Sequence, residues 1–111
     1  MRRMKLFTTK VYERTIGKLI PVESRRQMED AIAQDPDAAP IIPGTGGIRK
    51  LRWSVPGRGK RGGIRTIYFY HAGPEEIYLL TAYGKSDRED LSPADIKAWS
   101  RLVAEIKKEA K

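Results

Sequence analysis

The stretch IRTIYFYHAGPEEIYLLTAY, residues 64–83, contains two runs of β-branched and aromatic residues on either side of a polar segment. Such runs are typical of β-strands, and the intervening HAGPEE supplies the glycine and proline that favour a turn. Both runs are almost continuously apolar, which is the pattern of strands covered on both faces. The stretch therefore predicts two neighbouring antiparallel strands at the centre of a sheet.

A further strand is predicted just before this stretch, at Ile48–Trp53. Successive side chains of a strand point to opposite faces, so Leu51 and Trp53 share one face while Lys50 and Arg52 share the other. Residues 5–9 predict a short first strand. The three strands from residue 48 onward form an antiparallel meander.

Helices are predicted on both sides of the meander. Residues 10–19 form the first, and Pro21 suits the first position of a second helix that ends before Pro36. Residues 36–47 are turn-rich and predict a loop. In SPAD, residues 92–95, serine caps a last helix, proline follows at its first position, and an acid stands at the third. Two apolar stripes mark the buried helix faces: Met28, Ala31 and Ile32, and then Ile96, Trp99, Val103 and Ile106.

The predicted order β-α-α-β-β-β-α indicates an α+β fold in one domain over residues 1–111. N-terminal helices pack on a small, mainly antiparallel sheet, and a C-terminal helix closes the chain. We expect the helices to cover one face of the sheet and to leave part of the other face open.

The charge of the chain is strongly positive and unevenly distributed. The net charge is +8, and no acidic residue occurs between Ala38 and Pro74. A surface tuned only for solubility would mix both signs, so this clustering predicts a polyanionic partner, and nucleic acid first. The basic residues of the span are Arg49, Lys50, Arg52, Arg58, Lys60, Arg61 and Arg65.

The composition also bears on where the protein works in the cell. The chain has no cysteine, no apolar run long enough to cross a membrane, and no signal-peptide pattern. We therefore expect a soluble cytoplasmic protein without disulfides and without a membrane partner.

The segment VPGRGKRGGIR, residues 55–65, satisfies the dinucleotide-binding pattern G-x-G-x-x-G, but not its context. That fingerprint follows a strand and opens a helix, whereas these glycines lie between two strands. No acidic residue stands where the ribose-binding acid belongs, and no phosphate-loop motif of NTPases occurs. We expect no nucleotide cofactor here, but a hairpin loop whose Arg58, Lys60 and Arg61 approach a phosphate chain.

The chain has few side chains that could bind a catalytic metal or act as a histidine acid or base. The chain has one histidine, His71, which is expected at the surface rather than on a metal. Lysine, arginine and tyrosine remain, and they suit RNA cleavage by the RNA's own 2′-hydroxyl, because the protein then aligns atoms and stabilises charge on phosphorus. Arg65 can offer a guanidinium fork to phosphate oxygens. Tyr83 and Lys85 stand at the end of the third meander strand.

Three motifs, GTGGIRKLRW (44–53), GKRGGIRTIYFY (59–70) and LLTAYGKSDREDLS (79–92), together resemble the RelE/HigB superfamily of bacterial toxins, particularly HigB-type members. The resemblance implies a small α+β toxin that cuts mRNA on the translating ribosome. It also implies a cognate antitoxin, often a helix-turn-helix protein, through which alone the complex would bind operator DNA.

The resemblance also assigns roles to residues. Arg65, in the context G-x-R-x-x-Y, matches the arginine that stabilises the phosphate; Lys50 and Arg52 match paired basic residues, and Lys85 matches the lysine of a Gly-Lys pair. The RelE branch has an arginine where Ser86 stands here, and it has a later tyrosine that this chain lacks. The general base is therefore open between Tyr83, Lys60 and Lys50. The full prediction is a metal-free catalytic set of Arg65, Lys60, Tyr83 and Lys85, with RNA contacts from Arg49, Lys50, Arg52, Arg58 and Arg61.

Two other functions fit the same pattern. One is a ParE-like toxin that inhibits DNA gyrase without cutting RNA, since a fold does not determine a function. The other is an inactive RNA-binding module, which would bind with a steep dependence on salt and cleave nothing.

Overall fold

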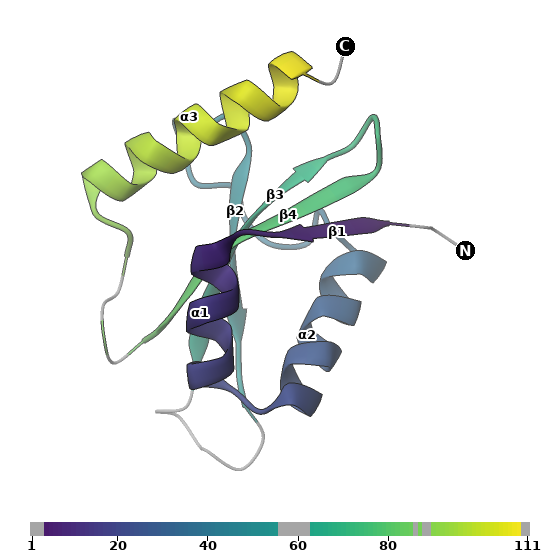
Figure 1. Cartoon of the computed structure of the whole chain (residues 1–111), viewed down its shortest axis with the longest axis vertical. Coiled ribbons are helices and arrows are strands. Elements are labelled where there is room, and N and C mark those ends of the chain that lie inside the picture. Colours follow the sequence, from purple (N-terminus) through teal and green to yellow (C-terminus); the bar gives the residue numbers. More distant parts are fainter. Residues whose placement is uncertain (1–3, 56–62, 86, 88–89, 110–111) are drawn as a thin grey trace.

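A computed structural model of the chain describes residues 4–55, 63–85, 87 and 90–109 (Figure 1). Its elements follow the predicted order, and strands and helices begin and end within a residue or two of the predicted bounds. They are β1 (Lys5–Thr8), α1 (Lys10–Leu19), α2 (Val22–Gln34), β2 (Ile48–Trp53), β3 (Ile64–His71), β4 (Glu76–Gly84) and α3 (Pro93–Glu109).

The strands form a four-stranded sheet in the order β1-β4-β3-β2. β2, β3 and β4 are antiparallel neighbours, and β1 adds to the outer side of β4 in parallel. The two strands with continuous apolar runs, β3 and β4, are therefore the central ones, as predicted. An irregularity between Ile67 and Tyr68 shifts the register of this central pair.

Helices lie on both faces of the sheet: one face is covered, and α3 leaves part of the other face open, in line with the expectation (Figure 1). α1 and α2 cover one face through a core cluster that includes Tyr12, Ile16, Met28 and Ile32. α3 packs on the opposite face, where a second cluster gathers Val103 with residues of all three meander strands. The apolar stripe of α3 needs a sheet face of its own, because α1 and α2 already fill the first.

The helix ends follow the predicted chemistry with two local corrections. The main-chain N–H of Asp95 donates to Ser92 Oγ over 3.1 Å, so serine caps α3 as expected. Pro21 precedes α2 as its cap residue instead of opening the helix, and Val22 comes first. Ala31 is exposed, because the buried side of α2 follows a spacing of four residues through Ser24, Met28 and Ile32.

The two faces of β2 differ as its alternation predicted. Leu51 and Trp53 pack against the cluster under α1 and α2, whereas Ile48 belongs to the cluster under α3. Lys50 and Arg52 therefore lie on the α3 side, beyond the part of that face that the helix covers. Among the described helices, none has the length and apolarity to cross a membrane.

Candidate functional site

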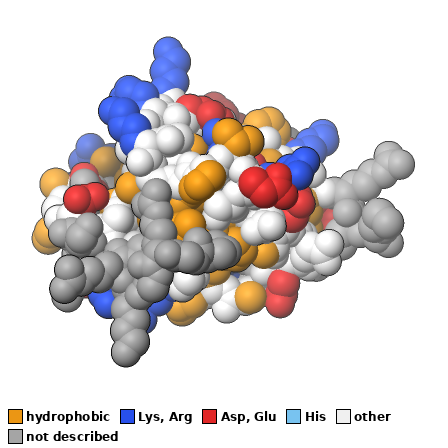
Figure 2. Space-filling model, turned by 90° about the horizontal axis from the view of Figure 1, so that it is seen from below, with side chains coloured by type: hydrophobic (Ala, Val, Ile, Leu, Met, Phe, Trp, Pro, Cys, Tyr) orange, Lys and Arg blue, Asp and Glu red, His pale blue; other side chains and the backbone are white. Residues whose placement is uncertain are grey.

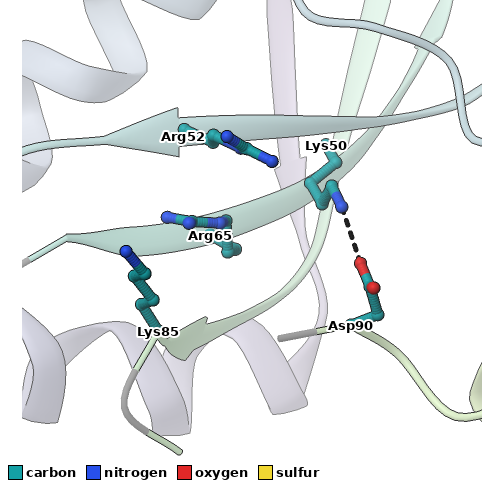
Figure 3. A pocket seen from close by; sticks show the side chains of 5 residues that line it. All are labelled: Lys50, Arg52, Arg65, Lys85 and Asp90. Atoms are coloured by element: carbon teal, nitrogen blue, oxygen red, sulfur yellow. Dashed lines mark hydrogen bonds and ion pairs between the residues drawn. The ribbon is translucent and has the colours of Figure 1, made fainter. Parts of the chain in front are cut away.

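A cavity of about 220 Å³ opens on the α3 side of the sheet, near the ends of β2, β3 and β4. Figure 3 shows how its charged side chains converge from different elements. Arg52 comes from β2, Arg65 from β3, and Lys85 follows β4 directly. The complete lining is Lys50, Arg52, Arg65, Lys85 and Asp90.

Strand pairing places two arginines directly opposite each other. Arg52 pairs with Arg65, and Arg65 pairs in turn with Tyr83 on β4. The main-chain N–H of Lys50 points away from β3, to the carbonyl of Pro40, so the alternate residue Arg52 forms a non-hydrogen-bonded pair with Arg65. Side chains approach most closely in such pairs, and like charges there are destabilising. An anion bound between the two guanidinium groups would offset that repulsion.

Asp90 brings a negative charge into this cationic cavity. Its Oδ1 accepts a 2.7 Å hydrogen bond from Lys50 Nζ (Figure 3). This hydrogen bond lowers the pKa of the Asp90 carboxyl below its usual value, and the charges of Lys50, Arg52 and Arg65 lower it further. The Asp90 side chain is 70% exposed, so an incoming phosphate can displace it from Lys50. Sequence reasoning did not assign Asp90 to the site, and its place in the acidic segment SDRED, residues 86–90, just after the Gly-Lys pair was the one available signal.

The turn after β4 places Lys85 at the rim. The Lys85 main-chain N–H donates to the Gly63 carbonyl over 3.2 Å, and Asp87 N–H donates to the Gly84 carbonyl over 3.0 Å. A Cβ at Gly84 would lie 3.0 Å from Asp87 Oδ2, so a larger residue there would require the Asp87 side chain to shift. The Lys85 side chain is left exposed beside Arg65.

Tyr83, predicted as a catalytic residue, lies beneath the site. Only 5% of it is exposed, and it belongs to the core cluster between the sheet and α3. It does not line the cavity. The burial favours a packing role, in which Tyr83 supports the strand position of Arg65.

Arg49, predicted to contact RNA, is turned away from the other cations. Its Nη1 donates to the carbonyl oxygens of Asp37 and Ala39, over 2.9 and 2.7 Å. Alternation along β2 separates Arg49 from Lys50 and Arg52, so Arg49 does not line this cavity, and its predicted contact with RNA stays a prediction. Its guanidinium holds the loop before β2.

The remaining predicted residues fall elsewhere. Arg58, Lys60 and Arg61 lie outside the described residues, so their predicted roles stay predictions. His71 stands at the far end of β3, roughly 20 Å along the strand from Arg65. It is half-buried, and its Nδ1 has no hydrogen-bond partner among the described residues and lies 4.0 Å from Glu76 Oε1. Within the described ranges, no group of metal-ligating side chains occurs.

The cavity gathers charge almost entirely of one sign. Figure 2 views the molecule from below Figure 1, and on this face Lys and Arg side chains are mixed with Asp and Glu and with exposed hydrophobic groups. The cavity, by contrast, brings together four cations and one exposed carboxylate. Such a set can bind a phosphodiester bidentately and stabilise additional negative charge on phosphorus.

The fold and this site define a small α+β protein with a cationic cavity on the sheet face that α3 covers in part. A family model describing the RelE toxin of the RelE/RelB toxin–antitoxin system matches residues 4–111, so the chain belongs to this family of toxins. The structure is also similar to that of a mutant of E. coli toxin RelE in the free state, with a TM-score of 0.53. That match covers 89% of this chain and 95% of the other at 11% identity, so it demonstrates a shared fold.

Proposed function

We propose that the protein is a ribosome-dependent mRNA endonuclease, and that it acts as the toxin of its toxin–antitoxin module by stopping translation. The observation that carries this proposal is the cavity in which Arg65 stands opposite Arg52 and beside Lys85. Membership of the RelE toxin family supports a toxin role, and the cavity supports chemistry at a phosphodiester.

The proposed reaction uses the RNA's own nucleophile. The 2′-oxygen of one nucleotide forms a bond to the adjacent phosphorus while the bond from phosphorus to the 5′-oxygen breaks. The products are a 2′,3′-cyclic phosphate and a 5′-hydroxyl, and one proton moves from the 2′-hydroxyl to a base while another reaches the leaving oxygen. Arg65 and Arg52 would hold the non-bridging oxygens, and Lys85 would add charge stabilisation as the oxyphosphorane forms.

The general base is proposed among the lysines. Lys50 lines the cavity, where its Nζ would have to give up both its hydrogen bond to Asp90 and a proton before acting as a base, while Lys60 was predicted from the sequence. Tyr83 is a poorer candidate, since it is buried in the core. Correct placement of the 2′-hydroxyl and the phosphate would then supply much of the rate, because alignment alone removes a large part of the barrier.

The proposed partners follow from the family. A cognate antitoxin, expected to be a helix-turn-helix protein, would neutralise the toxin in the cytoplasm and carry the complex to operator DNA. We infer that the antitoxin acts by masking the cationic cavity or by blocking access to the ribosome.

The test is brief expression from a tight promoter, with mRNA 5′ ends mapped by primer extension. The wild type should produce new ends within translated messages, whereas Arg65→Ala should reduce them at least about 100-fold, the usual cost of removing one preorganised charge-stabilising group. Arg101→Ala is the matched control, because Arg101 is an exposed arginine on α3 that does not line this cavity.

Three other outcomes of this experiment would contradict the proposal or favour a different function. Undiminished cleavage by a folded Arg65→Ala protein contradicts the site. Arrested growth with intact mRNA supports a gyrase inhibitor instead. Healthy growth with intact mRNA leaves an RNA-binding module.

A further inference from the structure

A second cavity adjoins the cationic one on the outer edge of β2. Its volume is also about 220 Å³, and it shares Lys50 and Arg52 with the first cavity. The rest of its wall is apolar and consists of Leu51 and the loop residues Ala38, Ala39 and Pro40. A ligand that spans both cavities therefore needs a phosphate at one end and a flat apolar part next to it.

The wall of this second cavity is held in place by hydrogen bonds from the sheet. Tyr68 Oη on β3 donates to the Pro36 carbonyl over 2.8 Å. Arg49 donates to the carbonyls of Asp37 and Ala39, and Lys50 N–H donates to the Pro40 carbonyl over 3.1 Å. The loop is thus fixed at successive positions before any ligand binds, and a preformed site saves the cost of ordering it.

Main-chain groups of β2 point toward the outer strand edge that borders this cavity. In the described part of the chain, pairing on the outer edge of β2 ends at Lys50, whose N–H meets Pro40. The alternation of a strand directs the N–H and C=O of Arg52 to the same outer edge as those of Lys50. One donor and one acceptor therefore lie beside the apolar wall, as recognition of a planar polar ring requires.

We propose that this second cavity binds the base of a nucleotide adjacent to the phosphate held by Arg52 and Arg65. The inference rests on the proposed function, since it takes RNA as the ligand. A lone inorganic phosphate would leave the apolar wall unused, and a purely apolar ligand would make no use of the shared Lys50 and Arg52. The volume is below the roughly 300–1,000 Å³ of pockets for drug-sized ligands, which suits one ring system and not a larger molecule.

The first experiment measures binding without cleavage. The probe is a short 2′-O-methyl RNA, which cannot react, compared with versions in which one nucleotide at a time is abasic and keeps its phosphate. Fluorescence anisotropy at low salt should show about a tenfold weaker affinity when the base that enters the cavity is missing, corresponding to 1.4 kcal/mol.

The test variant is Ala38→Trp, which fills the cavity from an exposed loop position. In this variant the abasic substitution should change affinity less than twofold, because the base site is already occupied. Val22→Trp is the matched control, since Val22 is 83% exposed at the start of α2 and an added indole there leaves the cavity open. Thermal unfolding checks all proteins, and Ala38→Leu replaces Ala38→Trp if the larger side chain prevents folding.

The two proposals fail in distinguishable ways. If Ala38→Trp, or the Ala38→Leu replacement, retains the full sensitivity to the missing base, the second cavity is not a base site, whatever the protein cleaves. If the wild type cleaves no mRNA on ribosomes but the base dependence disappears in Ala38→Trp, the nuclease proposal fails and the base site stands. If both hold, Ala38→Trp should also alter the relative cleavage of different codons, which Arg65→Ala should lower uniformly.

Discussion

At the scale of single residues, the pairing of Arg52 with Arg65 destabilises the free protein but suits the binding of an anion. The two side chains face each other across a non-hydrogen-bonded strand pair, where like charges repel most. A folded protein gains nothing from this arrangement unless an anion joins it. The repulsion therefore marks the site in the unliganded molecule.

We predict that Arg52→Gln stabilises the free protein and weakens RNA binding. Removing one charge while keeping a long side chain should raise the free energy of unfolding by about 0.2–1 kcal/mol, the usual size of a cross-strand pair effect. Urea unfolding at low salt measures the gain, which should shrink as salt screens the repulsion. Arg52→Lys keeps the charge and serves as the control, and an equal gain in that variant would contradict the electrostatic cause.

The ion pair between Asp90 and Lys50 is a second charged contact in the cavity. The Asp90 carboxylate neutralises Lys50 in the free protein, although the pair is too exposed to contribute much stability. Its depressed pKa means that the pair persists above the carboxyl's usual pKa and is lost only as the pH falls through the lowered value. At neutral pH, a phosphate must therefore compete with this carboxylate for Lys50.

At the scale of elements, the loop before β2 forms one wall of the second cavity and is held in place by the sheet. Residues 36–42 carry no regular strand or helix beyond an isolated bridge at Ile41, yet side chains from β2 and β3 hold their carbonyl groups. The strands thus position two cavities at once, a cationic one directly and an apolar one through this loop.

We predict that Arg49→Ala destabilises the protein without removing a phosphate contact. The lost hydrogen bonds involve a charged donor, so the free energy of unfolding should fall by about 1.5–3 kcal/mol. The slope of log affinity for RNA against log salt should stay unchanged, whereas Arg52→Gln should reduce it by about 0.7 for single-stranded RNA. A smaller slope in Arg49→Ala would support Arg49 as an RNA contact.

We predict that Tyr68 makes the fold sensitive to alkaline pH. Burial raises the pKa of Tyr68 from 10.0 to about 12 in the folded protein. Between these values the unfolded chain loses the proton and the folded chain keeps it, so stability is full below pH 10 and falls as the pH rises toward 12. The loss from this residue is on the order of 2–3 kcal/mol.

Urea unfolding of Tyr68→Phe between pH 8 and 12 isolates this contribution. The variant should be less stable at pH 8, because the Pro36 carbonyl loses its donor, and its stability should fall less steeply above pH 10. Burial and Glu76 also raise the pKa of Tyr78, to about 12, so some alkaline sensitivity should remain. Identical pH slopes in the two proteins would contradict the assignment.

At the scale of the whole molecule, one sheet separates two core clusters. Trp53 packs against the cluster under α1 and α2, and Trp99 packs against the cluster under α3. The strands β3 and β4 contribute buried residues to both clusters, so neither core can lose its sheet face while the other keeps it.

We predict that the two cores unfold together. The chain has two tryptophans, so Trp53→Phe and Trp99→Phe each leave one fluorescent reporter, on opposite faces. Within each variant, the fluorescence and circular dichroism transitions in urea should coincide, as expected for a small two-state domain. An earlier fluorescence transition in the Trp53→Phe variant would show that α3 detaches before the sheet unfolds.

The sequence alone determined the secondary structure, the central pair of strands and most of the cationic set. These are local properties: the period of apolar residues distinguishes strand from helix, and alternation along β2 is enough to place Lys50 and Arg52 together. The strand pattern also points to Arg65 and Lys85, both of which line the cavity, and the resemblance to RelE-type toxins supports the same two residues. The roles of Arg58, Lys60 and Arg61 remain predictions from the sequence.

Only the tertiary structure decided what depends on pairing between distant segments. The sheet register set Arg52 against Arg65, the packing of α3 on the second face buried Tyr83, and the return of the chain before α3 brought Asp90 to Lys50. The contacts of Arg49 could not be predicted from the sequence, because its partners are main-chain carbonyls of a loop, which have no signature in the side-chain pattern. Local propensity determines which elements form, whereas long-range packing determines which side chains meet.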